Sequence, residues 1–402
     1  MHILKHRKLL HKKLLMLLAV TLLWLIADNA LEFVFPTYLE DAGKSYFEIG
    51  LLLSIIAAGG ILIDLPMGVL SDRASKKKLM ISGLVLSVVA SILLFSFNGN
   101  ITLSIMFLIW GLAYQIWRVP RDALFASMTD KLERAEEYGL DTEVKYIGQT
   151  VGPVLAGAVL LYAGYSGIIG FYSILLISAV ILILVYVKET KATPITSDIS
   201  KSVKLSFITS ELKELKSFGS FGFILLYFSL LFTAWEQILL TFEPLFYGPD
   251  VLGVPSNIGG LLLAFFSLPG IFLSYPAGKV ADKVGKKTIM FIGLIVSGIS
   301  LIAFSTTSDL SSVFFFALLT SIGWVISLPA LNGLIIDLSY KHRKGCIAGI
   351  WALFMDIGFV AGPIIGGVIA EVYGIRQTFL AIGVLFLLSS ALLAATKTRR
   401  QD

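Results

Sequence analysis

The chain has 402 residues, of which 56% are hydrophobic and 15% charged, whereas soluble domains carry about a quarter charged residues. This balance excludes an ordinary soluble protein. The single cysteine, Cys346, excludes an intramolecular disulfide and a cysteine-based zinc cluster, and the four histidines lie in charged flanks, so no metal site and no cofactor is expected.

Twelve apolar runs follow one another along the chain, each with the length of about 17 residues or more that a membrane-spanning helix needs. They are Leu14–Leu39, Phe47–Leu70, Leu79–Phe97, Ile101–Met128, Val144–Ala163, Ile168–Val187, Phe221–Phe246, Ile258–Val280, Thr288–Phe304, Leu310–Leu338, Ile347–Val372 and Thr378–Ala395. The first run follows a basic segment, which also suits a signal peptide. Its length and its two acids favour an uncleaved helix. The pattern predicts an all-α membrane protein of twelve transmembrane helices.

The lysines and arginines predict the orientation of these helices. With the N-terminus in the cytoplasm, 28 of the 32 fall in inner segments and only Lys44 and Arg376 fall outside. Basic residues concentrate on the cytoplasmic side of membrane proteins. Both termini are therefore expected to be cytoplasmic in a multi-pass protein of the cell (inner) membrane. The net charge of +5 then indicates topology, and no nucleic-acid partner is expected.

One long polar stretch, from Lys188 to Gly219, interrupts the apolar runs near the middle of the chain. It predicts an N-terminal six-helix half over residues 1–190, a cytoplasmic linker over 191–219 and a C-terminal six-helix half over 220–402. Leu205, Ile208, Leu212 and Leu215 recur in the linker at helical spacing beside charged residues. This spacing suits an amphipathic helix on the membrane surface, and a solvated linker is an equally compatible interpretation.

The two halves repeat each other. Pro66, Gly68, Asp72, Lys76 and Lys77 recur 210 residues later as Pro276, Gly278, Asp282, Lys286 and Lys287. With an offset of 208, the acid-amide pairs and prolines of helices 1 and 7 also match: Asp28, Asn29 and Pro36 with Glu236, Gln237 and Pro244. Internal repeats of this kind are typical of secondary transporters.

The matched segments between helices 2 and 3 and between helices 8 and 9 carry a family resemblance. Gly68 to Lys78, with Asp72, Arg73 and three lysines, and Gly278 to Lys287, with Asp282 and Lys283, are similar to the loop signature of the major facilitator superfamily. Ser75 stands where that pattern usually has a second glycine. The resemblance implies two six-helix bundles around a central cavity, working by alternating access. It also implies a conformational gate in which Arg73 pairs with Asp130 and Lys283 pairs with Asp337.

Helix 5 carries Gly148, Gly152 and Pro153, and helix 11 repeats them as Gly358, Gly362 and Pro363. The helix 5 pattern resembles the signature of the antiporter, or efflux, branches of the superfamily, and close helix packing alone would also explain it. Helix 4 departs from the family pattern, because Trp117-Arg118-Val-Pro120-Arg121-Asp122 stands where an arginine before a Gln-Gly pair is often found.

Ionisable groups inside a bilayer are costly and usually face a cavity or a partner. The candidates for proton coupling or a substrate cavity are Asp28, Asn29, Glu32, Arg118, Glu236, Gln237, Glu243 and Asp356. At about 1.5 Å per residue, Asp28 lies near the membrane midplane, and Arg118 lies at the depth of Asp64, with which it could pair structurally. Arg121 and Asp122 lie nearer the cytoplasm and suit an inner gate.

Burial favours the protonated form of a carboxyl group, which can release its proton when the cavity wets or a cation arrives. The sequence thus favours proton-coupled antiport of a small apolar or cationic molecule, with Trp24, Tyr114, Trp117, Trp235 and Trp324 as possible stacking surfaces. A proton-coupled uptake symporter and a lipid or lysolipid translocase remain alternatives. No motif of an intramembrane enzyme occurs. The expected partners are a small-molecule substrate, protons and the lipid bilayer, and the chain is expected to act as a monomer.

Overall fold

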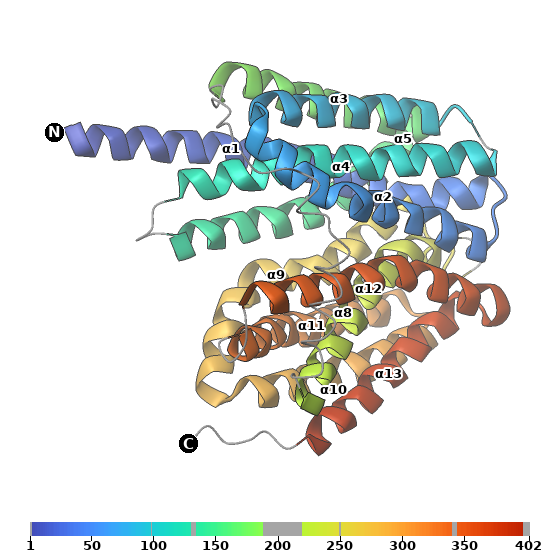
Figure 1. Ribbon diagram of the computed structural model, residues 1–402. Coiled ribbons are helices and arrows are strands. Elements are labelled where there is room, and N and C mark those ends of the chain that lie inside the picture. The colour runs from blue at the N-terminus through green and yellow to red at the C-terminus, as the bar shows by residue number, and fades with distance from the viewer. Residues whose placement is uncertain are drawn as a thin grey trace. The chain divides into compact units, whose positions relative to one another are not determined.

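The computed structural model describes residues 2–97, 99–129, 134–187, 219–248, 251–339 and 344–396 and is all-helical in these ranges (Figure 1). The helices of the first half are α1 (His2–Asp41), α2 (Tyr46–Arg73), α3 (Lys76–Leu94), α4 (Asn100–Met128) and α5 (Arg134–Tyr186). Those of the second half are α8 (Gly219–Phe246), α9 (Ser256–Val284), α10 (Lys286–Thr306), α11 (Leu310–Ser339), α12 (Lys344–Tyr373) and α13 (Ile375–Ala395).

The long helix α5 contains two of the predicted spans. Its backbone leaves helical geometry at Gly164, where φ is 61° and ψ is −165°. Glycine adopts such a left-handed conformation at little cost. Divided at this kink, α5 supplies helices 5 and 6, so the prediction of twelve helices is confirmed. The predicted linker helix lies outside the described residues.

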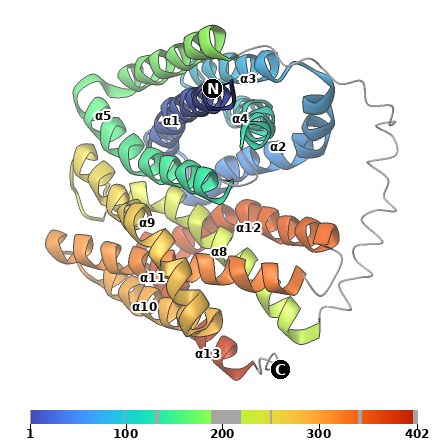
Figure 2. The ribbon, with the colours of Figure 1, turned by 90° about the vertical axis from the view of Figure 1, so that its left-hand side faces the viewer.

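The chain forms two compact units. Unit 1 comprises Met1–Ala42 and Leu52–Ser202, and unit 2 comprises Gly43–Leu51 and Val203–Asp402. In unit 1, α1 packs along α5 and α3 packs along α4. Figure 2 looks nearly along the axes of α1 and α4, which lie beside each other. In unit 2, α8 packs along α12, and α10 packs along both α11 and α13. The same pairs of helices therefore meet in each half.

Unit 2 also includes the first turns of α2. A Cβ atom on Gly367 of α12 would lie 2.7 Å from the carbonyl oxygen of Tyr46. Gly50 is likewise so close to Pro363 that a side chain there would overlap its carbonyl group. The Phe47 N–H donates to the Glu371 carboxylate at 3.4 Å. The start of α2 thus lies backbone to backbone against α12.

The outer surfaces of the helices are apolar. On helix 6, for example, Ile174, Ile177, Ile181 and Leu184 follow one another at helical spacing and are 53–65% exposed. An exposed apolar stripe of this kind is unfavourable in water and suits contact with lipid. The backbone of a helix satisfies its own hydrogen bonds, as lipid requires. Eleven of the described helices are long and apolar enough to cross a membrane.

Glycines allow the closest helix contacts in both units. A Cβ atom on Gly148 of α5 would lie 2.5 Å from Leu25 Cβ of α1, and one on Gly152 would lie 2.8 Å from the Ile26 carbonyl oxygen. In unit 2, a Cβ atom on Gly362 of α12 would lie 2.6 Å from the Ala234 carbonyl oxygen of α8. These distances leave no room for a side chain, so the matched glycines of helices 5 and 11 set the spacing to helices 1 and 7.

Candidate functional site: the buried charges of the two units

The charges of α1 lie in an aromatic environment. Asp28 is only 4% exposed and has Trp24 one turn before it and Glu32, which is half-buried, one turn after it. The Trp24 ring centroid lies 5.2 Å from that of Tyr114 and 5.6 Å from that of Trp117, both on α4. Acids beside aromatic faces are chemically suited to hold either a proton or an organic cation.

The amide next to Asp28 has a structural partner. The Asn29 side-chain nitrogen donates to the Leu25 carbonyl at 2.7 Å, and Asn29 Cβ lies against Gly152 of α5. Asn29 therefore stays within the contact between α1 and α5. Its role in a substrate cavity remains a prediction.

Arg118 pairs with the acid expected from its depth. Its guanidinium lies 3.5 Å from the Asp64 carboxylate of α2, and its Nε donates to Gln115 Oε1 at 2.7 Å. The side chains of Arg118 and Asp64 are 39% and 36% exposed, so water or a ligand can reach the pair.

Arg121 forms a more deeply buried network that the sequence did not indicate. Its side chain is 3% exposed and donates to the carboxylate of Asp141 on α5, which is 5% exposed. Its Nε also donates to Thr21 Oγ1 of α1 at 2.9 Å, and Asp122 accepts at 2.9 Å. Lys145 lies 3.1 Å from Asp141. The network joins α1, α4 and α5 within unit 1, whereas the sequence suggested an inner-gate role for Arg121 and Asp122.

In unit 2, Glu236 and Gln237 are half-buried on α8, whereas Asp28 and Asn29 are fully buried on α1. Asp356 of α12 is also half-buried. Trp235 lies on the adjoining face of α8 and packs against Phe379 and Phe386 of α13, so the core, rather than a binding surface, holds this tryptophan. The predicted stacking role of Trp235 is therefore not supported by its position.

Glu243 is the most completely buried acid of the predicted set. Its side chain is 0% exposed, and neither carboxyl oxygen has a hydrogen-bond partner. The hydroxyl group of Tyr247, in the turn directly after the end of α8 at Phe246, is also buried without a partner.

The predicted gate residues lie on helices rather than in loops. Helix α2 continues to Arg73 and α9 continues to Val284, so Gly68, Asp72, Gly278, Asp282 and Lys283 are all helical. A Cβ atom on Gly68 would meet nothing within 4 Å, so close packing does not explain this glycine. Asp130 lies outside the described residues, and its predicted pairing with Arg73 stays a prediction.

The partner of Asp337 differs from the predicted one. Its carboxylate lies 2.8 Å from Lys286 Nζ, and Lys286 also reaches Asp282 at 3.7 Å. The observed partner of Asp337 is therefore three residues later in the chain than the predicted Lys283. Lys286 stands at the start of α10, beside α11, whereas Lys283 still belongs to the end of α9.

The departure at Ser75 has a local explanation. Ser75 has an extended backbone and caps α3, because its side chain accepts from the Lys78 N–H at 3.4 Å. Gly285 takes the equivalent place before α10 with a φ of 111° and no side-chain cap. Serine and glycine thus solve the same helix start in two ways.

The basic runs also cap helix ends, a role that the sequence analysis missed. Lys77 Nζ donates to the Leu184 carbonyl in the last turn of helix 6 at 2.9 Å. Its repeat partner Lys287 donates to the Thr396 carbonyl at the end of α13. Cations stabilise helix C-termini. The two matched lysines therefore have the same role in the two units, since each stabilises the C-terminal end of the last helix of its unit.

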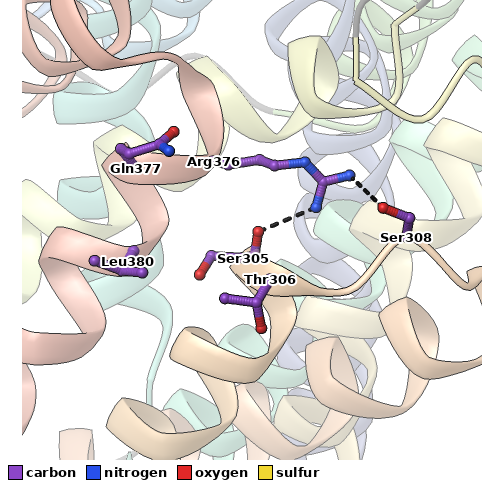
Figure 3. A pocket seen from close by; sticks show the side chains of 6 residues that line it. All are labelled: Ser305, Thr306, Ser308, Arg376, Gln377 and Leu380. Atoms are coloured by element: carbon purple, nitrogen blue, oxygen red, sulfur yellow. Dashed lines mark hydrogen bonds between the residues drawn. The ribbon is translucent and has the colours of Figure 1, made fainter.

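A cavity of about 280 Å³ lies in unit 2, away from the predicted acids, and Figure 3 shows its lining: Ser305, Thr306, Ser308, Arg376, Gln377 and Leu380. The Arg376 guanidinium donates to the carbonyl groups of Ser305 at 3.0 Å and Thr307 at 2.6 Å and to Ser308 Oγ at 3.0 Å. These bonds make Arg376 a clamp on the C-terminal end of α10.

Asp309, the residue after Ser308 of this cavity, caps the N-terminus of α11. The Ser312 N–H donates to its carboxylate at 2.9 Å, and the Ser312 hydroxyl donates at 2.8 Å. These bonds hold the pKa of Asp309 below its ordinary value. Asp309 is therefore charged at neutral pH and is unsuited to carry a proton.

Comparison with known proteins gives a family match that covers residues 17–402. The family model described as Major Facilitator Superfamily matches residues 17–260 and 249–402. Among curated proteins, the quinolone resistance protein NorA of Staphylococcus aureus is 35% identical over 138 residues, which is 34% of this chain and 35% of that protein. The chain thus matches only about a third of the length of this relative. An uncharacterized MFS-type transporter, MJ1560 of Methanocaldococcus jannaschii, is 22% identical over 86% of this chain and 88% of its own length.

Solved structures share the fold. A bacterial homologue of the human lysosomal transporter Spinster, inward-facing and unoccupied, aligns with a TM-score of 0.76 at 15% identity and covers 96% of both chains. The nucleoside transporter NupG aligns with a TM-score of 0.72 at 16% identity, over 96% of this chain and all of its own. At such identities the likeness shows the fold alone.

Proposed function

The chain belongs to the major facilitator superfamily and is a secondary transporter of the membrane, and we propose that it exports a small apolar or cationic molecule in exchange for protons. The observation that carries this proposal is the acid and aromatic cluster of unit 1, in which Asp28 is buried one turn from Trp24, whose ring packs against Tyr114. The partial similarity to a quinolone resistance protein supports a drug-like substrate.

Proton exchange follows from the electrostatics of Asp28. Charging an isolated buried carboxyl group costs several kcal/mol in a protein interior. Asp28 and Glu32 lie one turn apart on one helix face, so charging both together is less favourable still. A cation that enters the cluster would stabilise the carboxylate and displace the proton. Competition between a cation and a proton for one acid is the simplest basis for antiport.

The matching acid of unit 2 gives the mechanism a second candidate. Glu236 occupies the position of Asp28 in the repeat and is half-buried, without an ion pair among the described residues. It is therefore free to change its protonation when water reaches it. Because the two acids occupy matching positions in the repeat, either one can supply the proton-coupling group.

The test is flux in proteoliposomes with a quinolone as the probe. We expect Asp28→Asn to abolish export driven by a pH gradient, and Glu236→Gln to reduce it. Exchange at equal pH should be affected less, because an amide can still line the cluster. Glu143→Gln is the control, since Glu143 is exposed on α5.

If both variants and their combination keep full pH-driven export, these acids do not couple protons and the antiport proposal fails. Reversing the gradient and the side of substrate addition distinguishes export from uptake. Loss of flux in Asp28→Asn under all conditions would point to a defect in binding or folding instead.

A further inference from the structure

The internal repeat makes Glu243 an anomaly. With the offset of 208 that aligns Asp28 with Glu236, the counterpart of Glu243 in unit 1 is Phe35. Phe35 is 1% exposed and packs edge-on against Phe107 and Trp110, with ring centroids 5.2 Å apart in both pairs. The position is thus a core aromatic position in one unit and a carboxyl group in the other.

The surroundings of Glu243 are as apolar as those of Phe35. Its neighbours along α8, Phe242 and Phe246, are fully buried, and Phe246 stacks on Phe304 of α10 with centroids 4.6 Å apart. Neither carboxyl oxygen of Glu243 has a hydrogen-bond partner. A carboxylate here would be an isolated charge in a dry core, at a cost of several kcal/mol, so the group is protonated in this conformation.

The charged groups on the elements packed around α8 do not compensate Glu243. Arg376 of α13 lies over the Phe246 ring at 5.2 Å, with its guanidinium bonded to carbonyl groups. Glu371, at the end of α12, is exposed and accepts from Phe47. Asp356 lies near Gly358, which contacts α8 at Leu230, more than three turns before Glu243. The charged groups of α9, Lys279, Asp282 and Lys283, stand at its last turns, and on α11 Asp337 pairs with Lys286. Within the described part of the chain, none of these groups lies within ion-pair distance of Glu243.

The position of Glu243 along α8 suggests what it does. It follows Glu236 by seven residues, which is about 10 Å along the axis on the same helix face. Tyr247, in the turn that follows α8, has a hydroxyl group that is also buried and unpartnered. Polar groups therefore recur from the middle of α8, at Glu236, to its C-terminal end, at Glu243 and Tyr247.

We propose that Glu243 is a second proton-binding group of unit 2, separate from Glu236, which holds its proton in this conformation and releases it when the C-terminal end of α8 opens to water. On release, the carboxyl O–H bond breaks, its electron pair stays on the oxygen, and the proton bonds to water; reloading reverses the step. The proposal rests on the proposed function, because a releasable proton has a use only in a proton-driven carrier. It deepens that function by adding one proton to the transport cycle.

The first test needs no transport. Infrared difference spectra of the purified, lipid-reconstituted protein between acidic and alkaline buffer should contain the carbonyl band of a protonated buried carboxyl group. Glu243→Gln should remove one component of this band and leave those of Asp28 and Glu236, and Glu371→Gln, which changes an exposed acid, should leave the whole band. An unchanged band in Glu243→Gln would overturn the proposal.

A second variant separates this role from a structural one. Glu243→Leu replaces an unpartnered buried polar group by an apolar one of similar size, so the folded protein should melt at the same or a higher temperature. A large drop in melting temperature would show that the carboxyl group holds the fold together and would contradict the proposal.

The third measurement is the proton-to-substrate ratio of quinolone flux in proteoliposomes, obtained from the pH gradient at which net flux stops. We expect the ratio to fall by one proton per substrate in Glu243→Gln, and an unchanged ratio would overturn the proposal. If the wild-type protein shows no pH-driven flux at all, the proposed function fails, while the infrared spectra still decide whether Glu243 binds and releases a proton.

Discussion

Unit 1 and unit 2 pack equivalent helices together but carry different buried side chains at matching positions. Unit 1 places Arg121 against Asp141 in its interior, each no more than 5% exposed. With the offset of 210, unit 2 has Leu331 and Trp351 at these positions, and Leu331 is 2% exposed. One half thus carries a buried ion pair, and the other half carries two apolar side chains at the matching positions, the buried Leu331 and the half-buried Trp351.

The reverse exchange occurs between α1 and α8, where Phe35 of unit 1 corresponds to Glu243 of unit 2. Because each position also works with an apolar residue in the other half, neither buried charge is required by the repeat itself. A buried charge that the fold can do without points to a task for that charge, or to a local device for fixing one packing arrangement.

The contacts that both units keep are backbone contacts. Glycines of α5 lie against α1, and the equivalent glycines of α12 lie against α8. The comparison therefore predicts that equivalent glycine variants in the two units destabilise the protein to a similar extent. Variants at a buried charge have no counterpart in the other unit, because the matching residue there is apolar.

The largest effect is expected from Gly148→Val and Gly358→Val. A Cβ atom at Gly148 would lie 2.5 Å from Leu25 Cβ, and one at Gly358 would lie 2.6 Å from the Leu230 carbonyl oxygen. Overpacking of a tight core costs about 1–3 kcal/mol or more, and here the obstacle includes backbone that cannot rotate away. Both variants should lose most of the folded protein, measured by size-exclusion chromatography and melting temperature.

Gly170→Ala is the matched control, because a Cβ atom there meets nothing within 4 Å. It should leave the elution profile and the melting temperature unchanged. If only one of the two valine variants is harmful, the equivalence of the two helix contacts is wrong.

An intermediate effect is expected from the ion pair of unit 1. Removing one partner of a buried pair typically costs about 3–5 kcal/mol, whereas replacing both by apolar residues is often nearly neutral. Arg121→Leu and Asp141→Leu should each destabilise the protein strongly, and the double variant should recover much of the loss. It would give unit 1 apolar residues at both positions, as unit 2 has with Leu331 and Trp351.

A double-mutant cycle on the unfolding free energy in mixed detergent micelles measures this coupling. Lys145→Met is the control, since Lys145 is 52% exposed and its contact with Asp141 should contribute no more than about 1 kcal/mol. A double variant as unstable as the sum of its single variants would show that the pair does not act as a unit.

The helices were predictable because a bilayer makes severe demands. Every segment that crosses lipid must be helical and apolar over its length, so hydropathy alone located all twelve. The predicted ends differ from the observed ones mainly where polar residues extend a helix beyond the lipid, as at Arg73 and Val284. At Gly164 the backbone leaves helical geometry, so the two spans of α5 are separated by a kink rather than by a loop.

The side-chain partners were harder to predict. The pairing of Arg118 with Asp64 followed from depth, but that of Asp337 with Lys286 instead of Lys283 depends on how far α9 continues before α10 begins. The contact of Arg121 with Asp141 depends on how α4 and α5 are oriented about their own axes, and hydropathy does not specify this orientation. The gate function of Asp72 and Asp282 stays a prediction.

The smallest expected effect tests the lysine caps that the two units share. Lys77 bonds to the last turn of helix 6 and Lys287 to the end of α13, so Lys77→Met and Lys287→Met each remove one cation from a helix C-terminus. Such a contact contributes about 0.3–1 kcal/mol, too little to shift global melting noticeably. Hydrogen exchange should instead accelerate several-fold in the final turn of the helix concerned and nowhere else. Lys76→Met, at the neighbouring position, should leave both turns protected. Equal acceleration of exchange at the two helix ends would show that both halves keep this electrostatic contact together with the backbone geometry. Acceleration at only one end would show that the two halves differ in this contact, as they do in their buried charges.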